Sequence, residues 1–569
     1  MVNGPEQAAP TPAHRPRDTT PAELGFIPAS PVAWLSPVQL AGTGLRVALS
    51  SIQGGYLDKR ELQASFPDEV HREIGPDGDC WIDFVADLGD GFDATYSIAY
   101  LLAQPQLTVG EHVLPRGRAL ILGGDEVYPT PNAERYENRM VGPYHAALPA
   151  VAPGEDHPNM YALPGNHDWY DGLTAFLRLF TGTRRTGIGG WRLPQHRSYF
   201  AVELPGDWWL LAVDDQDSTY IDDPQLAYFS RVAANFGPQT KVIVASASPT
   251  WVQGDDVPGV YASLDYLVRS VVAPTEAQVR VMLSGDWHHY ARYGNDEREL
   301  ITCGGGGAYL FPTHQLPETI EVPPADLPSP TPRETFSLRS RFPGKRLSQA
   351  YAASIFARLP KDNPSFIAMV GTLHTAILLA ASGVIKSDFG SPLQKFALVP
   401  LVFLMSLVMA GTYAFAHLSD SVLGGLRRRV LGVLHGIAHL GLAALGTWAW
   451  WVLPLHAWPW PWSLIAEIGI YGVLSGLAAT ELVAVYLLIA ARFNVNLNEL
   501  FSAQGIVDSK SFLRLHVAAD GTLTIYPIGV RKVSRSWRVT PEGQPHESWL
   551  APQDKLHARL IESPIVLKP

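Results

Sequence analysis

The sequence predicts an α/β fold for the first half of the chain, followed by a four-helix membrane segment and a small β segment. Short apolar runs in the first half each lead into a tight turn, which is typical of strands in a sheet that helices cover on both faces. Four long apolar stretches then follow one another. A chain of 569 residues is too long for one hydrophobic core, so we expect several folding units.

Changes in polarity along the chain suggest five segments. The first residues lack the apolar core of a secretory signal, so we expect a polar tail and a first half that is not exported. Prolines and acidic residues are frequent in 317–332, which favours a linker. Asp520 and Gly521 separate two strand-like runs and predict a β-hairpin. The expected segments are a disordered N-terminal tail (1–40), the α/β domain (41–315), a Pro-rich linker and pre-membrane segment (316–362), four transmembrane helices (363–493) and a C-terminal cytoplasmic β segment (494–569).

The composition limits the classes of partner. The net charge of −11 argues against nucleic-acid binding, which normally needs a basic surface. A phosphorylated small molecule is not excluded, because a metal ion can supply positive charge locally. The two cysteines, Cys80 and Cys303, suggest neither a disulfide framework nor a thiolate metal cluster, which fits a reducing compartment.

Four apolar stretches have the length of membrane spans. A helix rises 1.5 Å per residue, so about 20 apolar residues cross a hydrocarbon core of roughly 30 Å. Four such stretches in succession favour membrane helices over the buried helices of a large soluble protein. The stretches are Phe366–Ile385, Phe396–His417, Val430–Leu453 and Leu464–Ala491.

The basic residues around these stretches predict an orientation. Arginines and lysines are frequent before the first stretch, Arg427–Arg429 join the second to the third, and Arg492 follows the fourth. The other two loops carry only Lys386 and Lys395. The basic side faces the cytoplasm by the positive-inside rule, so both termini and the α/β domain are expected there. The tryptophan-rich loop 456–462 would lie at the opposite interface.

Ionisable residues within the spans suggest a second candidate site. His435 and His439 are four residues apart and share one face of the third helix. Glu467 and Glu481 lie in the fourth. Ionisable groups are costly in a bilayer and often functional, so a metal or proton site is one interpretation. Neutral histidines hydrogen-bonded between helices, with Glu467 near an interface, are the other, and we weigh this second interpretation slightly higher.

Several predicted strands end in residues that bind metals. Carboxylates, an amide oxygen and imidazoles suit Mn, Fe or Zn, and polar groups at strand ends are where open α/β sheets place their sites. One or two divalent ions could hold a phosphate and lower the pKa of a bound water. Each of four apolar runs contains or precedes candidate ligands. Run 81–88 contains Asp87, and run 119–122 precedes Asp125. Run 160–163 precedes Asn166, His167 and Asp168, and run 280–283 precedes Asp286, His288 and His289.

In this order the turns resemble the motifs of the calcineurin-like metallophosphoesterase superfamily, and most closely those of purple acid phosphatases. Asp87–Gly89 matches a DxG motif, Gly124–Tyr128 matches GDxxY, and Gly165–Asp168 matches GNH followed by an acid. Gly285–His288 is an altered GHxH motif. The resemblance covers roughly residues 80–310 and implies a four-layer α/β/β/α metallophosphoesterase sandwich.

The resemblance also implies roles for individual residues. Ligands of a first metal would be Asp87, Asp125, Tyr128 and His288, with Asp125 bridging to a second metal that Asn166 also binds. His167 would contact the substrate and protonate the leaving oxygen. Asp168 would orient His167 and raise its pKa by stabilising the protonated ring.

Two departures from the family pattern weaken the second metal site. The fourth motif should end in histidine, but 242–249 contains none, and Asp286 replaces the first histidine of the fifth motif. Asp286 with His289 or His314 could rebuild the site, or the site could be weak or empty. Tyr128 could be a ligand or only pack beside the site.

Two further features have simpler interpretations. For the glycine run 304–307, a close-packed turn is favoured over a phosphate cradle. The pair Asp214 and Asp215 could be a solvated strand end.

The expected function is that of a membrane-anchored phosphoesterase. A metal-bound hydroxide would hydrolyse phosphomonoesters or phosphodiesters, with His167 as the acid. The substrate would be a phosphorylated small molecule or a lipid-linked phosphate next to the lipid bilayer. The alternatives are a catalytically weakened sensor of a phosphorylated ligand, or a regulator of a membrane domain that itself transports or senses.

Overall fold

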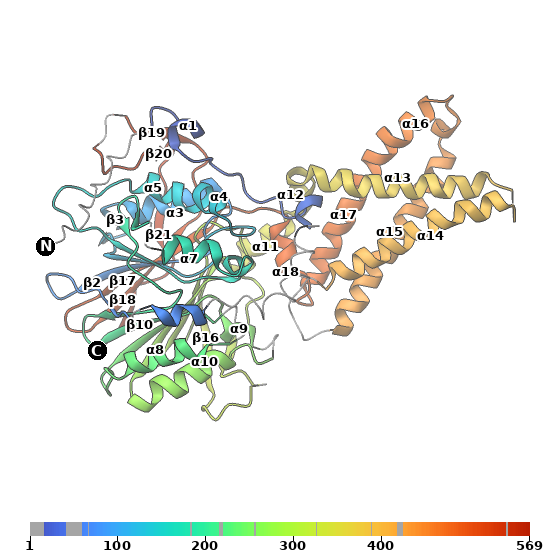
Figure 1. Ribbon diagram of the computed structural model, residues 1–569. Coiled ribbons are helices and arrows are strands. Elements are labelled where there is room, and N and C mark those ends of the chain that lie inside the picture. Colours follow the sequence, from blue (N-terminus) through green and yellow to red (C-terminus); the bar gives the residue numbers. More distant parts are fainter. Residues whose placement is uncertain are drawn as a thin grey trace.

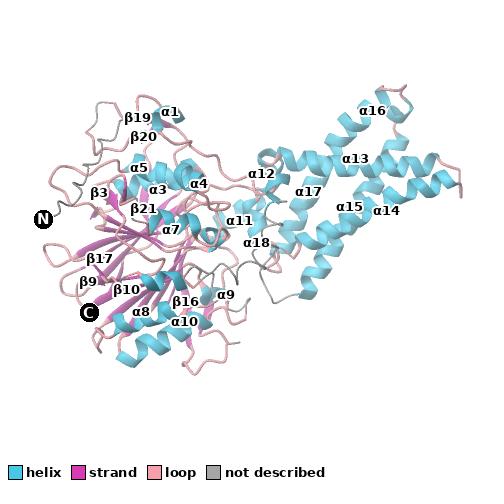
Figure 2. Cartoon of the chain, viewed as in Figure 1, coloured by secondary structure: helices cyan, strands magenta, loops and turns pink. Residues whose placement is uncertain are grey.

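A computed structural model describes residues 16–40, 42, 60–66, 68–182, 185–215, 220–254, 258–325, 327–388, 390–417, 425–541 and 544–569. It contains a mixed α/β domain with two large sheets, from which four long helices project (Figure 1). The sheets and the helices that cover them form the larger body, and the long helices extend from one end of it (Figure 2).

The first sheet, sheet 1, contains the strands that carry most of the candidate site. Its central strands β2, β5 and β6 are parallel, as expected for strands whose turns meet at one edge. The strand order is β21 (Ala558–Leu560), β18 (Leu523–Val530), β17 (Lys510–Val517), β2 (Cys80–Val85), β5 (Ala119–Leu122), β6 (Asn159–Ala162), β8 (Trp191–Arg192) and β7 (Gly187–Ile188), with β22 (Ile565–Leu567) beside β18.

The second sheet, sheet 2, supplies the remaining part of the site. Strands β10, β11, β12 and β14 are parallel neighbours at its centre. The strand order is β1 (His71–Arg72), β9 (Phe200–Leu204), β10 (Trp208–Val213), β11 (Lys241–Ser246), β12 (Gln278–Ser284), β14 (Glu299–Cys303), β13 (Tyr290–Gly294), β16 (Glu334–Phe342) and β15 (Thr319–Val322).

Three apolar layers hold the domain together. The central layer lies between the sheets, where Phe84 of sheet 1 and Ile243 of sheet 2 are buried together. Neighbouring residues face the other way, because side chains alternate along a strand. Val85 packs under the helices that cover sheet 1, and Leu211 under those that cover sheet 2. The covering helices are α3 (Phe92–Ala103), α5 (Gly142–Ala147) and α7 (Thr174–Phe180) on sheet 1, and α8 (Asp223–Ala233) and α10 (Ala262–Leu267) on sheet 2.

The C-terminal segment is part of sheet 1, whereas the sequence suggested a separate small β segment. The expected hairpin is present, with Gly521 at φ 86° between β17 and β18. Strand β17, however, lies between β18 and β2 in the sheet. Its Arg514 donates two hydrogen bonds to Asp83 of β2, at 2.7 and 2.9 Å, and both side chains are buried. The domain therefore combines strands that precede the membrane helices in the sequence with strands that follow them.

The predicted linker, 316–362, is also folded into the domain. Strands β15 and β16 form one edge of sheet 2, and Val322 and Phe336 are buried there. An edge strand tolerates flanking prolines because one of its sides needs no ladder hydrogen bonds, which explains why a proline-rich segment still forms strands. Helices α11 (Lys345–Ala353) and α12 (Ile355–Asp362) then lead to the membrane segment.

The N-terminal segment is ordered over its described part. Residues 1–15 lie outside the described residues, but residues 16–40, which the sequence predicted to be disordered, pack on the domain. Leu24, Phe26 and Leu35 are buried. The amide of Val32 donates to Asp90 Oδ1 at 2.7 Å. The apolar residues of this segment are scattered among prolines and show no helix or strand periodicity. Its folding onto the domain is therefore visible only in the tertiary structure.

The four predicted membrane helices are confirmed as helices long and apolar enough to cross a bilayer. Close contacts between glycines help them pack, because a Cβ added to Gly371 would meet Gly472 O at 2.3 Å. Apolar side chains such as Phe396 and Phe403 remain exposed on the bundle, as a lipid-facing surface requires. The helices are α13 (Pro364–Lys386), α14 (Pro392–Phe415), α15 (Gly425–Val452), and α16 (Trp462–Ala466) continued through a π-helical turn by α17 (Gly472–Ala491).

Candidate metal centre

Two aspartates follow neighbouring parallel strands and are held side by side by their backbones. Asp87 follows β2 and Asp125 follows β5. The amide of Asp87 donates to Gly124 O at 2.9 Å, and that of Leu88 donates to Asp125 O at 2.8 Å, so pairing continues beyond the strands. Both aspartates have positive φ, 60° and 56°. Such conformations cost energy in non-glycine residues and cluster at functional sites.

A histidine from sheet 2 completes a group of three ligand-type side chains. His288 follows β12, and one ligand atom each from Asp87, Asp125 and His288 lie within 4.8 Å of one another. All three side chains are buried. The Tyr128 hydroxyl donates to Asp125 Oδ2 at 2.8 Å and lies 3.0 Å from His288 Nε2. The sequence-predicted first-metal residues therefore converge.

Glycines allow the sheets and loops to come this close. A Cβ added to Gly285 would lie 2.4 Å from the Cβ of Ala86, where the two sheets meet. A Cβ on Gly304 would lie 1.9 Å from Asp87 Oδ2. The other glycines of 304–307 would clash with Ser511 or the backbone of Ala86 and Leu88. The glycine run is thus the close-packed turn that the sequence favoured.

Asn166 and His167 lie at the start of the short helix α6 (Asn166–Trp169), next to Asp125. The His167 amide donates to Asp125 Oδ1 at 2.9 Å. The His167 ring is held by its Nδ1, 2.9 Å from Pro129 O. A carbonyl accepts there, so Nδ1 carries hydrogen and Nε2 is the atom available for proton transfer.

The hydrogen bonds of Asp168 go to backbone amides and to Tyr136, whereas the resemblance implied that Asp168 orients His167. The carboxylate Oδ2 accepts from the amides of Gly165 at 3.0 Å and Glu126 at 3.3 Å, and the Oδ1 accepts from the Tyr136 hydroxyl. Neighbouring residues of a helix diverge by about 100°, so Asp168 turns back to cap α6 while His167 points elsewhere. The group that positions the His167 ring is a neutral carbonyl.

The residues proposed for a second metal are arranged less simply. The Asp286 amide donates to Asp87 Oδ1 at 3.0 Å, while Asp286 Oδ2 accepts from Gln253 Nε2 at 3.1 Å. Gln253 ends helix α9 (Thr250–Gln253), just after the strand that lacks the expected histidine. At that strand end Ala247 packs within 3.3 Å of the Cβ position of Gly124, so an alanine lies beside the site.

The two additional histidines are placed differently from each other. His289 is fully buried beside His288, between Trp287 and Phe311. His314 lies away from the aspartates, with its Nδ1 2.8 Å from Ser348 Oγ on α11. The strand-end carboxylates Asp214 and Asp215 are buried, and Asp214 accepts from Trp169 Nε1 at 3.2 Å, so this strand end is not solvated.

The electrostatics of the cluster favour a bound cation. Burial, then repulsion by Asp125 and Asp286, raises the pKa of Asp87 well above its usual range. Burial, then the positive charge of Lys510, lowers the pKa of His288 well below its usual range and keeps the ring neutral, as a metal ligand must be. Two buried oxygens, Asp87 Oδ2 and Asn166 Oδ1, have no hydrogen-bond partner among the described residues. A divalent ion fits this set of donors.

Three residues at the site were missed by the sequence analysis. Trp34, from the N-terminal segment, has its ring within 6.1 Å of Tyr128, 5.9 Å of His167 and 5.4 Å of Tyr309. Tyr309 packs edge-on against His288 at 4.5 Å. Lys510 of β17 is buried, and burial lowers its pKa to about 8. The only signal in the sequence for Tyr309 was its place after the glycine run.

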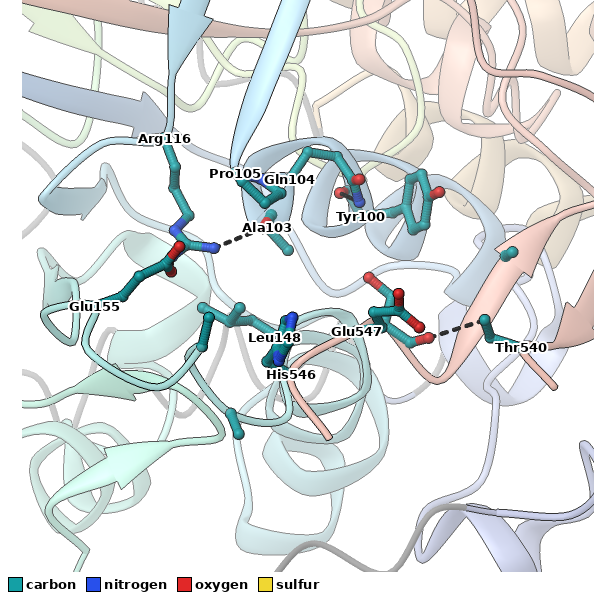
Figure 3. Close-up of a pocket in the computed structure, with 14 residues that line it drawn as sticks. Tyr100, Ala103, Gln104, Pro105, Arg116, Leu148, Glu155, Thr540, His546 and Glu547 are labelled. Carbon is teal, nitrogen blue, oxygen red and sulfur yellow. Dashed lines mark hydrogen bonds and ion pairs between the residues drawn. The ribbon is translucent and has the colours of Figure 1, made fainter. Parts of the chain in front are cut away.

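A separate cavity lies at the end of α3. It has a volume of about 380 Å³ and is lined by the end of α3 and by tail residues that include Thr540, His546 and Glu547 (Figure 3). Arg116 at its wall is paired with Glu155 at 2.9 Å and also donates to Ala103 O. No residue of the candidate metal centre lines this cavity.

The membrane histidines form a larger group than the sequence suggested. His435 and His439 of α15 are joined by His374 of α13, and all three are buried. Glu467 and Glu481 form no hydrogen bond or ion pair with these histidines among the described residues. The cluster therefore consists of histidines from two helices.

Comparisons with known proteins give little guidance. No family model matches the chain, and no curated protein matches its sequence. Among solved structures, the chain is similar to one described as GAP50, the anchor in the inner membrane complex of Plasmodium. The identity is 10%, the match covers 48% of this chain and 94% of that chain, and the TM-score is 0.32. A likeness at that score carries no argument about this protein.

Proposed function

We propose that this chain is a membrane-anchored, metal-dependent phosphoesterase of the calcineurin-like type, with a purple acid phosphatase-like motif set on a four-layer sandwich. The observation that carries the proposal is the convergence of Asp87, Asp125 and His288 from three strand ends and two sheets. Buried carboxylates that face each other without a cation are unfavourable, so a structural role alone does not account for them.

The ion would be held by Asp87, Asp125 and His288, with Asn166 next to it and Tyr128 beside it. Such an ion supplies Lewis-acid chemistry, polarising a phosphoryl oxygen and making a water molecule more acidic. The protein contributes a site that is buried and already arranged. Three fixed strand ends and the hydrogen bonds of Tyr128 and His167 to Asp125 hold the donors without a change of fold.

His167 is the residue proposed to transfer a proton to the leaving oxygen. Its backbone is fixed on Asp125 and its ring on Pro129, so its Nε2 stays at one position near the ligands. Trp34 packs edge-on against the ring, at 5.9 Å between centroids. A substrate oxygen that reaches this nitrogen can accept a proton as its bond to phosphorus breaks.

The site is close to the membrane end of the domain, which favours lipid-linked phosphates among the substrate classes. Tyr309, beside His288, donates its hydroxyl to Asn498 of α18 (Leu497–Ser502), the helix that follows the last span. A headgroup at the bilayer surface and a soluble phosphate ester are both compatible with the metal chemistry. A comparison of hydrolysis rates with a water-soluble aryl phosphate and a phospholipid monoester in mixed micelles distinguishes them.

The test uses the purified full chain in detergent, supplied with Mn²⁺ and an aryl phosphate. We expect hydrolysis together with at least one bound ion per chain by elemental analysis. Asp87→Asn and Asp125→Asn should lose both, while Asp156→Asn, an exposed carboxylate paired with Arg118, should keep both. A chain that binds no ion and hydrolyses none of a broad set of phosphate esters contradicts the proposal.

A second candidate function is a sensor that binds a phosphorylated ligand without turnover. The observation that favours it is the incomplete second site, where Ala247 lies at the strand end and Asp286 is bonded to Gln253. The stoichiometry of bound metal discriminates between the two functions, because two ions per chain favour hydrolysis. Metal-free chain that still binds inorganic phosphate favours the sensor.

A further inference from the structure

The three membrane histidines lie in a line across the helix bundle. His439 of α15 is the central ring and uses its two nitrogens for different neighbours. Its Nδ1 is 3.3 Å from His374 Nε2 on α13, and its Nε2 is 3.2 Å from His435 Nε2, one turn earlier on α15. The side chains are buried at 1% (His374), 7% (His439) and 5% (His435) exposure.

This arrangement suits a proton better than a metal ion. A single ion needs one nitrogen from each ring pointing to a common centre. His439 instead points its two nitrogens at two different neighbours. Metal-bound histidines usually donate their second nitrogen to a carboxylate or carbonyl, and both nitrogens of His439 face other histidines. A neutral imidazole has one N–H and one lone pair, so three rings in a line can pass hydrogen bonds in one direction.

The ends of the line are unsatisfied in the neutral state. The Nδ1 atoms of His374 and His435 are buried and have no hydrogen-bond partner among the described residues. Burying unpaired polar atoms in a bilayer is costly, so the group is unlike a purely structural contact. One additional proton would convert the links within the line into charge-assisted hydrogen bonds, which are roughly twice as strong as neutral ones.

Among the described residues, no countercharge pairs with the rings, so an added proton is stabilised by the hydrogen bonds between the rings and by the aromatic face of Tyr486. The titratable groups that face the rings are the other histidines and Tyr486 of α17, which stacks on His435 at 3.9 Å and 6°. Phe415 at the end of α14 packs near His435 at 6.3 Å. Among the described residues of α13, α14, α15 and α17, no carboxylate, ammonium or guanidinium group forms a hydrogen bond or ion pair with the rings.

We propose that His374, His439 and His435 form a proton-binding site within the membrane segment, in which one added proton is shared along the three rings. The proton comes from water and forms an N–H bond at an outer ring. A ring that gains a proton on one nitrogen releases the proton of its other nitrogen to the next ring, so each N–H bond formed is matched by one broken and the line keeps one extra proton. This site does not depend on the hydrolytic function proposed above.

A chain of contacts connects the site with the α/β domain. A charge on His435 strengthens its contact with the face of the Tyr486 ring. The Tyr486 hydroxyl donates to Asn496 Oδ1 at 2.7 Å, and Asn496 directly precedes α18. From α18, Asn498 accepts from Tyr309, which packs on His288. The histidine line is thereby connected to the candidate metal centre through a series of side-chain contacts.

The test measures protons and inter-ring bonds on the full chain in lipid nanodiscs. Between pH 8 and pH 5, His439→Gln should take up about one proton fewer per chain than the wild type in a difference titration. Thr447→Val is the matched control, because Thr447 lies buried on the same helix, donates to Ala443 O and is not titratable, so this variant should keep the wild-type proton uptake. Equal proton uptake by wild type and His439→Gln overturns the proposal.

A second measurement needs no variant. With ¹⁵N in the histidine rings, the wild-type chain should show nitrogen–nitrogen coupling across hydrogen bonds between the rings at pH 5 in solid-state NMR. Absence of any such coupling overturns the proposal. Elemental analysis provides another contradicting outcome. If a metal ion is found in the wild type and in Asp87→Asn but not in His439→Gln, the rings are metal ligands and the proposal is wrong.

Discussion

Asp87 is the residue whose chemistry determines how the candidate metal centre responds to pH. Its pKa is raised from an ordinary value of 3.8, first by burial and then by Asp125 and Asp286. Without an ion, the folded state binds more protons than the unfolded chain above pH 3.8, so the stability contributed by the protonated form is lost as pH rises through the folded pKa. A metal ion prefers the ionised carboxylate and reverses this loss.

We therefore predict that metal stabilises the protein more at pH 8 than at pH 5. At an ion concentration about 100-fold above Kd, the gain in unfolding free energy is about 2.7 kcal/mol. The measurement is thermal unfolding of the full chain with Mn²⁺ or with a chelator. Asp87→Asn should remove most of the pH dependence, and Asp156→Asn should retain it. A metal effect that is the same at both pH values contradicts the prediction.

We predict separable roles for His167 and Asp168, because Asp168 accepts hydrogen bonds at the start of α6 whereas the His167 ring lies against Pro129 O. We predict that His167→Ala lowers the rate of aryl phosphate hydrolysis by about 10²- to 10⁴-fold with metal content unchanged. Asp168→Asn should mainly lower stability, since the Gly165 and Glu126 amides lose a charged acceptor. Steady-state kinetics and denaturant unfolding measure the two effects. His196→Ala, at a surface ion pair with Glu69, is the control.

At the scale of elements, strand β17 joins the segment after the membrane helices to the sheet before them. Its pairing with β2 buries Arg514 against Asp83, more than 400 residues earlier in the chain. A buried ion pair is weak evidence for stability as such, but removing one partner leaves an uncompensated charge. The tail is thus required for the domain, which could not fold from residues 1–362 with the same sheet.

The corresponding prediction concerns the two arginines of the tail. Arg514→Met should lower the free energy of unfolding by about 3–5 kcal/mol, because Asp83 remains buried and unpaired. Arg535→Met is the matched control, since Arg535 pairs with Asp508 at an exposed position and such pairs contribute about 1 kcal/mol or less. Denaturant unfolding followed by tryptophan fluorescence measures both. Similar losses for the two variants would show that the β17 pairing is not what stabilises the domain.

At the scale of the whole molecule, an even number of spans leaves the α/β domain and the tail on the same side of the bilayer. That parity is required by the fold, since β17 must reach β2. The charge distribution then predicts which side this is. Basic residues cluster around Arg427–Arg429 and before α13, so both termini and the α/β domain are expected in the cytoplasm.

Cysteine labelling tests this orientation with little background, because Cys80 and Cys303 are both fully buried. A cysteine introduced at an exposed tryptophan, Trp460→Cys, should react with a membrane-impermeant maleimide in intact cells. Arg427→Cys should react only after the cells are permeabilised. The reverse pattern would place the α/β domain outside the cytoplasm and contradict the charge argument.

The sequence alone determined the features that depend on local composition. Four apolar stretches of spanning length became four helices, because a helix satisfies its own backbone hydrogen bonds. Apolar strands leading into Asp87 and Asp125 brought these two carboxylates together, since the carboxyl ends of neighbouring parallel strands share one edge. The packing of the second sheet on the first then added His288. Only the resemblance to known motifs attached a function to that cluster.

The tertiary structure decided everything that depends on which distant segments meet. The insertion of β17 beside β2 and the packing of Trp34 at the site have no local signal. The sequence shows that His374 lies in an apolar stretch, but not that it meets His439. Asp168 follows His167 directly, yet its carboxylate turned to the helix start. The physical reason is that local patterns fix burial and periodicity, whereas partners are chosen by packing summed over the whole chain.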